Sequence, residues 1–189
     1  MTNRMTRAST LIATVSIAVI ALVVGGCGST SGGKYEEHGV SLQIPDGWKT
    51  GKVTLQTNTG NELWSKAFAP AEGPDLVALT AYPINQSISA DNIAAYESEL
   101  SSFMADLAQN SGGSVTDGPT SVTMGGLPGF RFEASFPDKK GTLESRIMMV
   151  FKGKTEYYLN CQHRSDSSRA AEIESGCNSI ADSFELTGA

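Results

Sequence analysis

The stretch FRFEASFPDKKGTLESRIMMVF, residues 130–151, decides the fold class. Apolar residues alternate with polar ones over 130–136, which predicts a strand that is buried on one face. The charged turn at 138–141 then reverses the chain, and residues 147–151 are apolar on both faces, as in the central strand of a sheet. The stretch therefore predicts two neighbouring antiparallel strands within a larger sheet.

Similar patterns lie on both sides of this hairpin. Two amphipathic helices are predicted at 93–107 and 167–184, from apolar residues at helical spacing. The connections between strands are mostly too short for parallel crossovers. We therefore predict a single α+β domain over residues 34–189, an antiparallel sheet of about six to seven strands flanked by helices. Strands are predicted at 40–44, 53–57, 62–68, 76–82, 121–124, 130–136, 142–151 and 155–161, with a loop at 125–129 and a turn at Gly153-Lys154.

The N-terminus has a different composition. Arg4 and Arg7 precede an uncharged, mostly apolar run over 8–24, an order typical of an export signal. Val24-Gly25-Gly26-Cys27 follows and resembles a bacterial lipobox. An uncleaved membrane span is the alternative, but the run is somewhat shorter than the roughly 20 apolar residues that a span needs.

The lipobox resemblance implies a diacylglyceryl group on the Cys27 sulfur and cleavage before this residue, with the thiolate as nucleophile. We expect a signal peptide at 1–26 and a lipidated, flexible tether at 27–33, rich in Gly and Ser. Two acyl chains give stable anchoring. The expected location is the extracytoplasmic face of the cell membrane.

The charge balance excludes some classes of function. The chain has 14 Lys and Arg against 20 Asp and Glu, a formal net charge of −6. Loss of Arg4 and Arg7 with the leader would take it to −8. Such a chain lacks the cations that displace counterions from nucleic acid, so no nucleic-acid partner is expected. Anionic headgroups would repel it, so lipid rather than charge should hold it at the membrane.

Two cysteines remain beside Cys27. Cys161 shares a strand face with Leu159, and Cys177 lies on the apolar stripe of the last helix, so both sulfurs should enter one interface. In an exported protein this predicts a disulfide, which closes a loop of about 16 residues and stabilises the fold by roughly 3 kcal/mol. Two alternatives stay open: a zinc site that includes His163, and a pair of buried free thiols.

The sequence contains no complete catalytic motif. Gly153-Lys154-Thr155 is similar to the end of a phosphate loop, but Met148 stands where that motif needs a Gly. The sequence has no His-Glu-x-x-His, no calcium loop and no nucleophile elbow. We therefore predict a protein that is not an enzyme, with no cofactor and no metal.

Three stretches resemble a known family. Residues 39–48, a strand followed by Pro-x-Gly-Trp, resemble the opening of PsbP-like domains. Residues 117–131 resemble the Gly-Leu-Pro hairpin of actinobacterial LpqN-type lipoproteins, and residues 157–184 are similar to their terminal strand and Cys-linked helix. The resemblance implies an α/β/α sandwich around an antiparallel sheet. It implies a protein-binding or assembly role and supplies no catalytic residues.

The sequence therefore favours two possible functions. The first is a non-enzymatic cell-envelope lipoprotein that binds a protein partner or assists assembly on the outer face of the membrane. The second is a carrier for a small amphiphile such as a lipid or glycolipid. Its cavity would be lined by Phe103, Met104, Met148 and Met149, because Met adapts to varied ligands. Ordinary packing of these four residues in the core is the other interpretation.

Overall fold

The computed structural model describes residues 32–52 and 61–188. The predicted signal peptide, the lipidation site at Cys27 and the strand predicted at 53–57 lie outside these ranges. No helix in the described part of the chain is long and apolar enough to cross a membrane.

Within the described residues, nine strands form two antiparallel sheets, which confirms the predicted sheet. The smaller sheet has the order β1 (Gly33–Glu37), β2 (Val40–Ile44) and β9 (Glu185–Leu186). The larger sheet has the order β3 (Lys49–Gly51), β4 (Trp64–Ala69), β5 (Leu76–Ile88), β8 (Gly141–Arg164), β7 (Leu127–Asp138) and β6 (Ser114–Met124).

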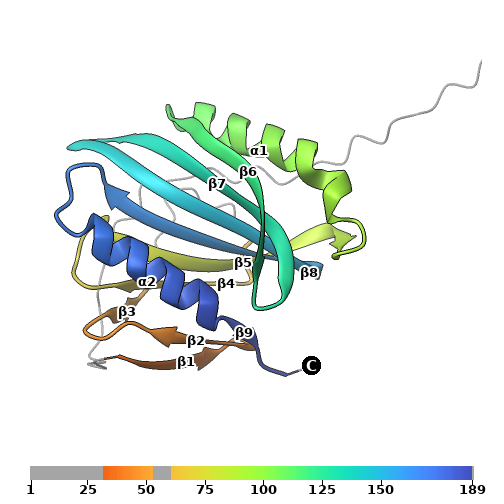
Figure 1. Ribbon diagram of the computed structural model, residues 1–189, viewed down its shortest axis with the longest axis horizontal. Helices are drawn as coiled ribbons and strands as arrows, with labels where there is room; N and C mark the ends of the chain where they lie inside the picture. Colours follow the sequence, from red (N-terminus) through yellow and green to blue (C-terminus); the bar gives the residue numbers. More distant parts are fainter. Residues whose placement is uncertain (1–31, 53–60, 189) are drawn as a thin grey trace, which may run out of the picture.

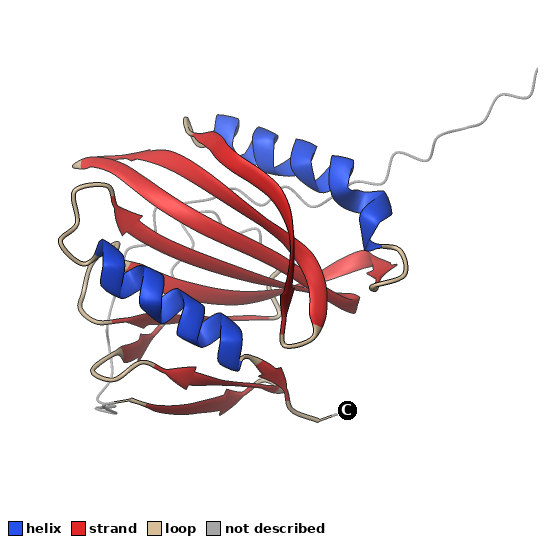
Figure 2. Ribbon diagram, viewed as in Figure 1, coloured by secondary structure: helices blue, strands red, loops and turns tan. Residues whose placement is uncertain are grey.

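Two helices lie on opposite faces of the larger sheet. Helix α1 (Glu97–Asn110) follows the short 3₁₀ helix η1 (Ile93–Tyr96) and packs on β6 and β7. Helix α2 (Ala170–Ser183) packs on β8, β5 and β2, so the smaller sheet lies beside it (Figure 1). Figure 2 shows the resulting layers, with the larger sheet between the two helices. This arrangement confirms the expected α/β/α architecture.

Each face of the larger sheet has its own hydrophobic core. On one face, Leu100, Met104 and Leu107 of α1 repeat at helical spacing and pack against the phenylalanines of β7. On the other face, Ile173 and Ile180 of α2 lie between the larger and smaller sheets. Apolar residues on both faces of β8 contribute to both cores, as expected for a central strand.

Strand β8 corrects one prediction. It runs unbroken through Gly153-Lys154, where the sequence predicted a turn between two strands. Gly153 has a φ of 58°, a conformation that costs Gly little, and it bends the strand instead of reversing it. Residues 141–150 pair with β7, and residues 153–162 pair with β5. The bend also shifts the alternation of the strand. Even-numbered residues such as Met148 lie on the α2 face before the bend, and odd-numbered residues such as Cys161 lie on that face after it.

Other differences concern the ends of elements. Strand β5 continues past Pro83, because the ladder with β8 becomes irregular between Pro83 and Ile88, where the missing N–H of Pro is tolerated. Strand β6 begins at Ser114, earlier than predicted, and β1 and β9 were not predicted. The loop predicted at 125–129 is a two-residue turn, Gly125-Gly126, in which both residues have positive φ, as a tight hairpin requires.

Candidate functional site

The disulfide ties α2 to the centre of the larger sheet. Cys161 on β8 and Cys177 on α2 are bonded to each other, with a Cα–Cα distance of 5.7 Å, and both are fully buried. The predicted pairing is therefore confirmed. The open alternatives of a zinc site and of free thiols are wrong, because each sulfur is already bonded to the other. In the described ranges, no group of three or more His, Cys, Asp or Glu could hold a metal ion.

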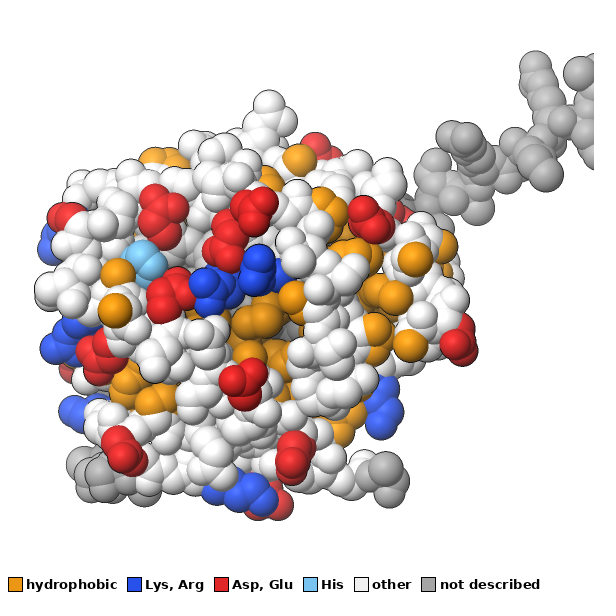
Figure 3. All heavy atoms as spheres, viewed as in Figure 1, with side chains coloured by type: hydrophobic (Ala, Val, Ile, Leu, Met, Phe, Trp, Pro, Cys, Tyr) orange, Lys and Arg blue, Asp and Glu red, His pale blue; other side chains and the backbone are white. Residues whose placement is uncertain are grey.

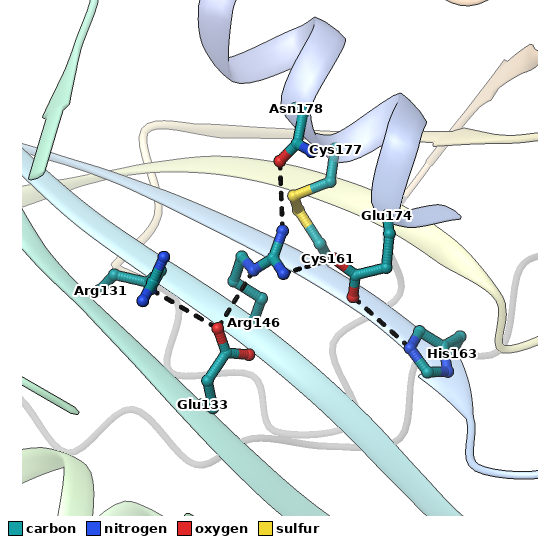
Figure 4. Close-up of a disulfide and its surroundings, with 8 residues drawn as sticks. All are labelled: Arg131, Glu133, Arg146, Cys161, His163, Glu174, Cys177 and Asn178. Carbon is teal, nitrogen blue, oxygen red and sulfur yellow. Dashed lines mark hydrogen bonds and ion pairs between the residues drawn. A yellow bond between two sulfur atoms is a disulfide. The ribbon is translucent and has the colours of Figure 1, made fainter. Parts of the chain in front are cut away.

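Beside the disulfide, a row of charged side chains bridges β7, β8 and α2. Arg146 on β8 lies between two carboxylates, with its Nε 3.1 Å from Oε1 of Glu133 and its Nη2 paired with Glu174 (Figure 4). Nη1 of Arg146 donates to Oδ1 of Asn178 at 3.2 Å. Arg131 approaches the same Glu133 oxygen at 3.5 Å. The row thus fixes the edge of α2 against two strands.

His163 extends this row at the end of β8. Its Nε2 lies 3.5 Å from Oε1 of Glu174, and its Nδ1 lies 2.9 Å from the carbonyl oxygen of Arg164. The sequence grouped His163 with the two cysteines as possible metal ligands, and the structure gives it a carboxylate partner instead. The two arginines and two glutamates balance each other, so the row is hydrogen-bonding but close to neutral.

An apolar floor adjoins the charged row. Arg131 pairs in register with Met148. Two residues away on β7, Gly129 pairs with Val122 on β6 and with Val150 on β8. Leu127 completes the floor beside the β6–β7 hairpin. In Figure 3 this face is hollowed, with hydrophobic atoms on the floor and Lys or Arg atoms along one side.

The hollow exists because α2 covers part of the face. Helix α2 makes its main contacts with β2, β8 and β5, whereas β6 and β7 are packed by α1 on the opposite face. The sheet between α2 and the β6 edge is therefore only partly covered: Val122, Arg131 and Arg146 are part-exposed, while Leu127 and Met148 are nearly buried at its floor (Figure 3). We refer to this region as the open face and define it by five residues: Val122, Leu127, Arg131, Arg146 and Met148.

The open face ends at an edge strand. β6 is the last strand of the larger sheet, and its pairing with β7 is irregular between Val115 and Thr120. Such bulges blunt an edge against uncontrolled pairing. From Thr120 to Met124 the ladder is regular, and Thr120, Ser121 and Thr123 are exposed. This short segment can accept an extended chain through its free backbone groups.

Three of the four residues proposed for an amphiphile cavity come together, but the fourth does not. Met104 and Met149 are buried in the core under α1, with Phe103 packed at its margin. Met148 belongs to the core on the opposite face. Because neighbouring residues of a strand point to opposite faces, Met148 and Met149 cannot line one cavity. The four residues therefore do not form the lining that the sequence suggested.

The sequence did not predict the charged row. Arg131 and Glu133 were expected on the polar face of a strand, but nothing in their spacing showed that Arg146 and Glu174 would meet them. The contact depends on the pairing of β7 with β8 and on the position of α2, both long-range features. The alternation of polar and apolar residues predicts which face of the sheet a residue lies on. It does not predict which residues of other strands lie next to it.

The fold is PsbP-like. A comparison with solved structures finds the PsbP protein CyanoP of Synechocystis sp. PCC 6803 at a TM-score of 0.56 and 14% identity, covering 86% of this chain and 98% of that one. LpqN of Mycobacterium tuberculosis, described as involved in cell envelope biogenesis, matches at a TM-score of 0.50 and 14% identity, covering 79% and 83%. This confirms the fold expected from the PsbP-like resemblance.

A third structure, a protein from Bacteroides thetaiotaomicron VPI-5482, matches at a TM-score of 0.52 and 15% identity. The match covers 84% of this chain, which spans about half of that protein, 50%. No family model and no curated protein matches the sequence. At these identities the similarity shows the fold alone, and the narrower LpqN-type assignment stays a prediction.

Proposed function

We propose that this protein is a non-enzymatic lipoprotein of the bacterial cell envelope, anchored through Cys27 on the extracytoplasmic face, where it acts as a protein-binding or assembly module. The partner docks on the open face beside α2. The observation that carries this proposal is the apolar floor of the open face and its rim of paired arginines and glutamates.

The chemistry of the rim favours a protein over an anionic lipid. Protein interfaces combine an apolar centre with a polar rim and are rich in Arg. Here Arg131 and Arg146 are each paired with a carboxylate, so the rim offers both hydrogen-bond donors and hydrogen-bond acceptors. An anionic headgroup would meet Glu133 and Glu174 together with the arginines. A polypeptide, with its own donors and acceptors, complements such a surface better.

The comparisons agree with this role. LpqN is described as involved in cell envelope biogenesis, and its fold is shared by this chain. The sequence adds the lipobox that would hold the domain at the membrane. The alternative, an amphiphile carrier, has less support because its proposed lining is divided between the two faces of the sheet.

Site-specific photocrosslinking in the native envelope tests the docking face. Thr120 and Ser121 are neighbours on β6, both exposed, and they point to opposite faces of the sheet. A benzophenone amino acid at Thr120 should give a discrete adduct with one recurring protein, and the same group at Ser121 should not. Met148→Arg, which places a charge on the apolar floor, should abolish the Thr120 adduct. No adduct at Thr120, or equal adducts at both positions, would contradict the proposal.

A second experiment tests the anchor separately. In a bacterial host, Cys27→Ala should prevent lipid attachment and leave a longer, unprocessed chain. Mass spectrometry of the wild type should find a lipid-modified N-terminus at Cys27. An unmodified N-terminus with full membrane retention would overturn the lipoprotein part of the proposal and leave the docking face untouched.

A further inference from the structure

A second group of polar side chains lies on the opposite face of the larger sheet. Tyr82 on β5 pairs in register with Glu156 on β8, and Tyr158 lies two residues further along the same face. Leu63 donates its N–H to the carbonyl oxygen of Ala81, which brings the preceding Glu62 beside Tyr82. We call Glu62, Tyr82, Glu156 and Tyr158 the tyrosine–glutamate cluster.

Several polar atoms in and beside this cluster are buried without a hydrogen-bond partner. Oε2 of Glu62 is buried without a hydrogen bond, and neither Glu62 nor Glu156 forms an ion pair with any described residue. The hydroxyl of Tyr158, a residue only 8% exposed, is also unpartnered. Oδ1 of Asn160, the next residue on this face, is also buried without a hydrogen-bond partner. Buried polar groups normally find partners, so this concentration is unusual.

The electrostatics of the cluster disfavour an uncompensated negative charge. Burial raises the pKa of Glu156 to about 7, because its charged form is poorly solvated there. Burial and the nearby Glu156 also raise the pKa of the Tyr158 hydroxyl, which therefore stays neutral. A carboxylate without a counter-ion in such a place is costly, and a bound cation would offset that cost.

The two tyrosine rings fit an organic cation. Tyr82 and Tyr158 meet edge to face, with ring centroids 6.3 Å apart and planes at 81°. Aromatic faces attract ammonium groups, most strongly when water is excluded. A metal ion fits less well, since no group of three or more His, Cys, Asp or Glu occurs within the described ranges. An anion would meet two carboxylates.

We propose that the tyrosine–glutamate cluster is a binding site for a small organic ammonium ion. The ammonium N–H groups donate to the carboxylates of Glu62 and Glu156, which both lie beside Tyr82, and the carbon chain of the ligand lies against the rings of Tyr82 and Tyr158. This site is on the face of the sheet away from the open face, so it binds independently of the docked protein.

Calorimetric titration of the purified full chain tests the site. The probes are methylammonium, n-butylammonium and putrescine, each compared with the neutral alcohol or diol of the same chain length. We expect saturable binding of at least one amine, with its neutral counterpart at least about tenfold weaker, because a hydrogen bond to a charged group is worth more than a neutral one. If no amine binds better than its alcohol, the proposal is wrong.

Two variants and a control locate the binding. Glu156→Gln removes the charge, and Tyr158→Phe removes a hydroxyl that has no partner in the fold, so neither should unfold the domain. Glu156→Gln should weaken amine binding by about tenfold, whereas Tyr158→Phe, which keeps the aromatic ring, should leave it nearly unchanged. Glu133→Gln removes a carboxylate from the opposite face and should leave the dissociation constant unchanged. Equal binding by all three variants would place the amine elsewhere and overturn the assignment.

Discussion

The indole of Trp48 lies directly on the backbone of Gly176, so that a Cβ at Gly176 would come within 2.3 Å of Trp48 Cη2. Trp48 follows the Pro-x-Gly turn after β2, where its N–H donates to the carbonyl oxygen of Pro45 at 3.1 Å. It is 2% exposed. The contact joins the β2–β3 connection to α2, and it explains why the buried stripe of this helix includes a Gly.

Gly176→Ala should therefore destabilise the domain although Ala favours helix formation. The added methyl has no space unless the indole moves, and overpacking of this kind costs about 1–3 kcal/mol. Denaturant unfolding followed by Trp fluorescence measures the loss. Ser179→Ala, on the exposed side of the same helix, should change the stability by less than about 0.5 kcal/mol. A Trp48→Leu, Gly176→Ala double variant should lose less than the sum of the single variants.

Much of this packing was foreseeable from local pattern. The alternation over 130–136 and the stripe of Ile173, Cys177 and Ile180 predicted which faces are buried. The partition of Met148 and Met149 between two cores follows from the same rule, but a candidate cavity built from residue type alone ignored it.

What could not be read from the sequence depends on long-range pairing. Gly153-Lys154 has the composition of a turn, and its actual role as a bend follows from having β7 and β5 on opposite sides of one strand. The ion pairs of Arg146 and the unpartnered Glu156 depend on strand register and helix placement in the same way. The residues next to Arg146 or Glu156 in the sequence do not indicate which side chains will lie beside them in the fold.

The bend at Gly153 gives a second prediction. A left-handed φ of 58° costs a side chain with a Cβ about 1–2 kcal/mol, less for Asn. The domain should therefore lose stability in the order Gly153→Asn, Gly153→Ala, Gly153→Val. Val also favours an extended strand, which would turn Cys161 away from α2. Thiol labelling of the denatured, unreduced protein should find more free thiol in Gly153→Val than in Gly153→Asn, and equal labelling would show that the bend does not position Cys161.

The disulfide gives a third prediction. Cys161 and Cys177 are separated by 16 residues, and a loop of this size contributes about 3 kcal/mol by restricting the unfolded chain. A Cys161→Ala, Cys177→Ala double variant should lose about that much free energy of unfolding. The reduced wild type should lose a similar amount. A loss well under about 1 kcal/mol in both would mean that the packing of α2 on β8 suffices without the covalent bond.

The last prediction concerns the pH dependence of stability through Glu156. Its pKa is raised by burial from 4.5 to about 7 in the folded protein, so the folded state holds a proton that the unfolded state releases. The stability from this group is therefore full below pH 4.5, falls as the pH rises toward 7, and levels off above it. At pH 8, Glu156→Gln should be more stable than the wild type by up to about 3 kcal/mol, and the two should converge at pH 4.

Urea unfolding at a series of pH values measures this difference. Glu172→Gln, which removes an exposed carboxylate from α2, is the matched control because it changes the net charge equally. Its stability should run parallel to that of the wild type across the range. An amine that occupies the tyrosine–glutamate cluster should raise the stability of the wild type at pH 8 and raise that of Glu156→Gln less, since binding only the folded state stabilises it. A Glu156→Gln profile parallel to the wild type would mean that this carboxyl is solvated in the folded protein.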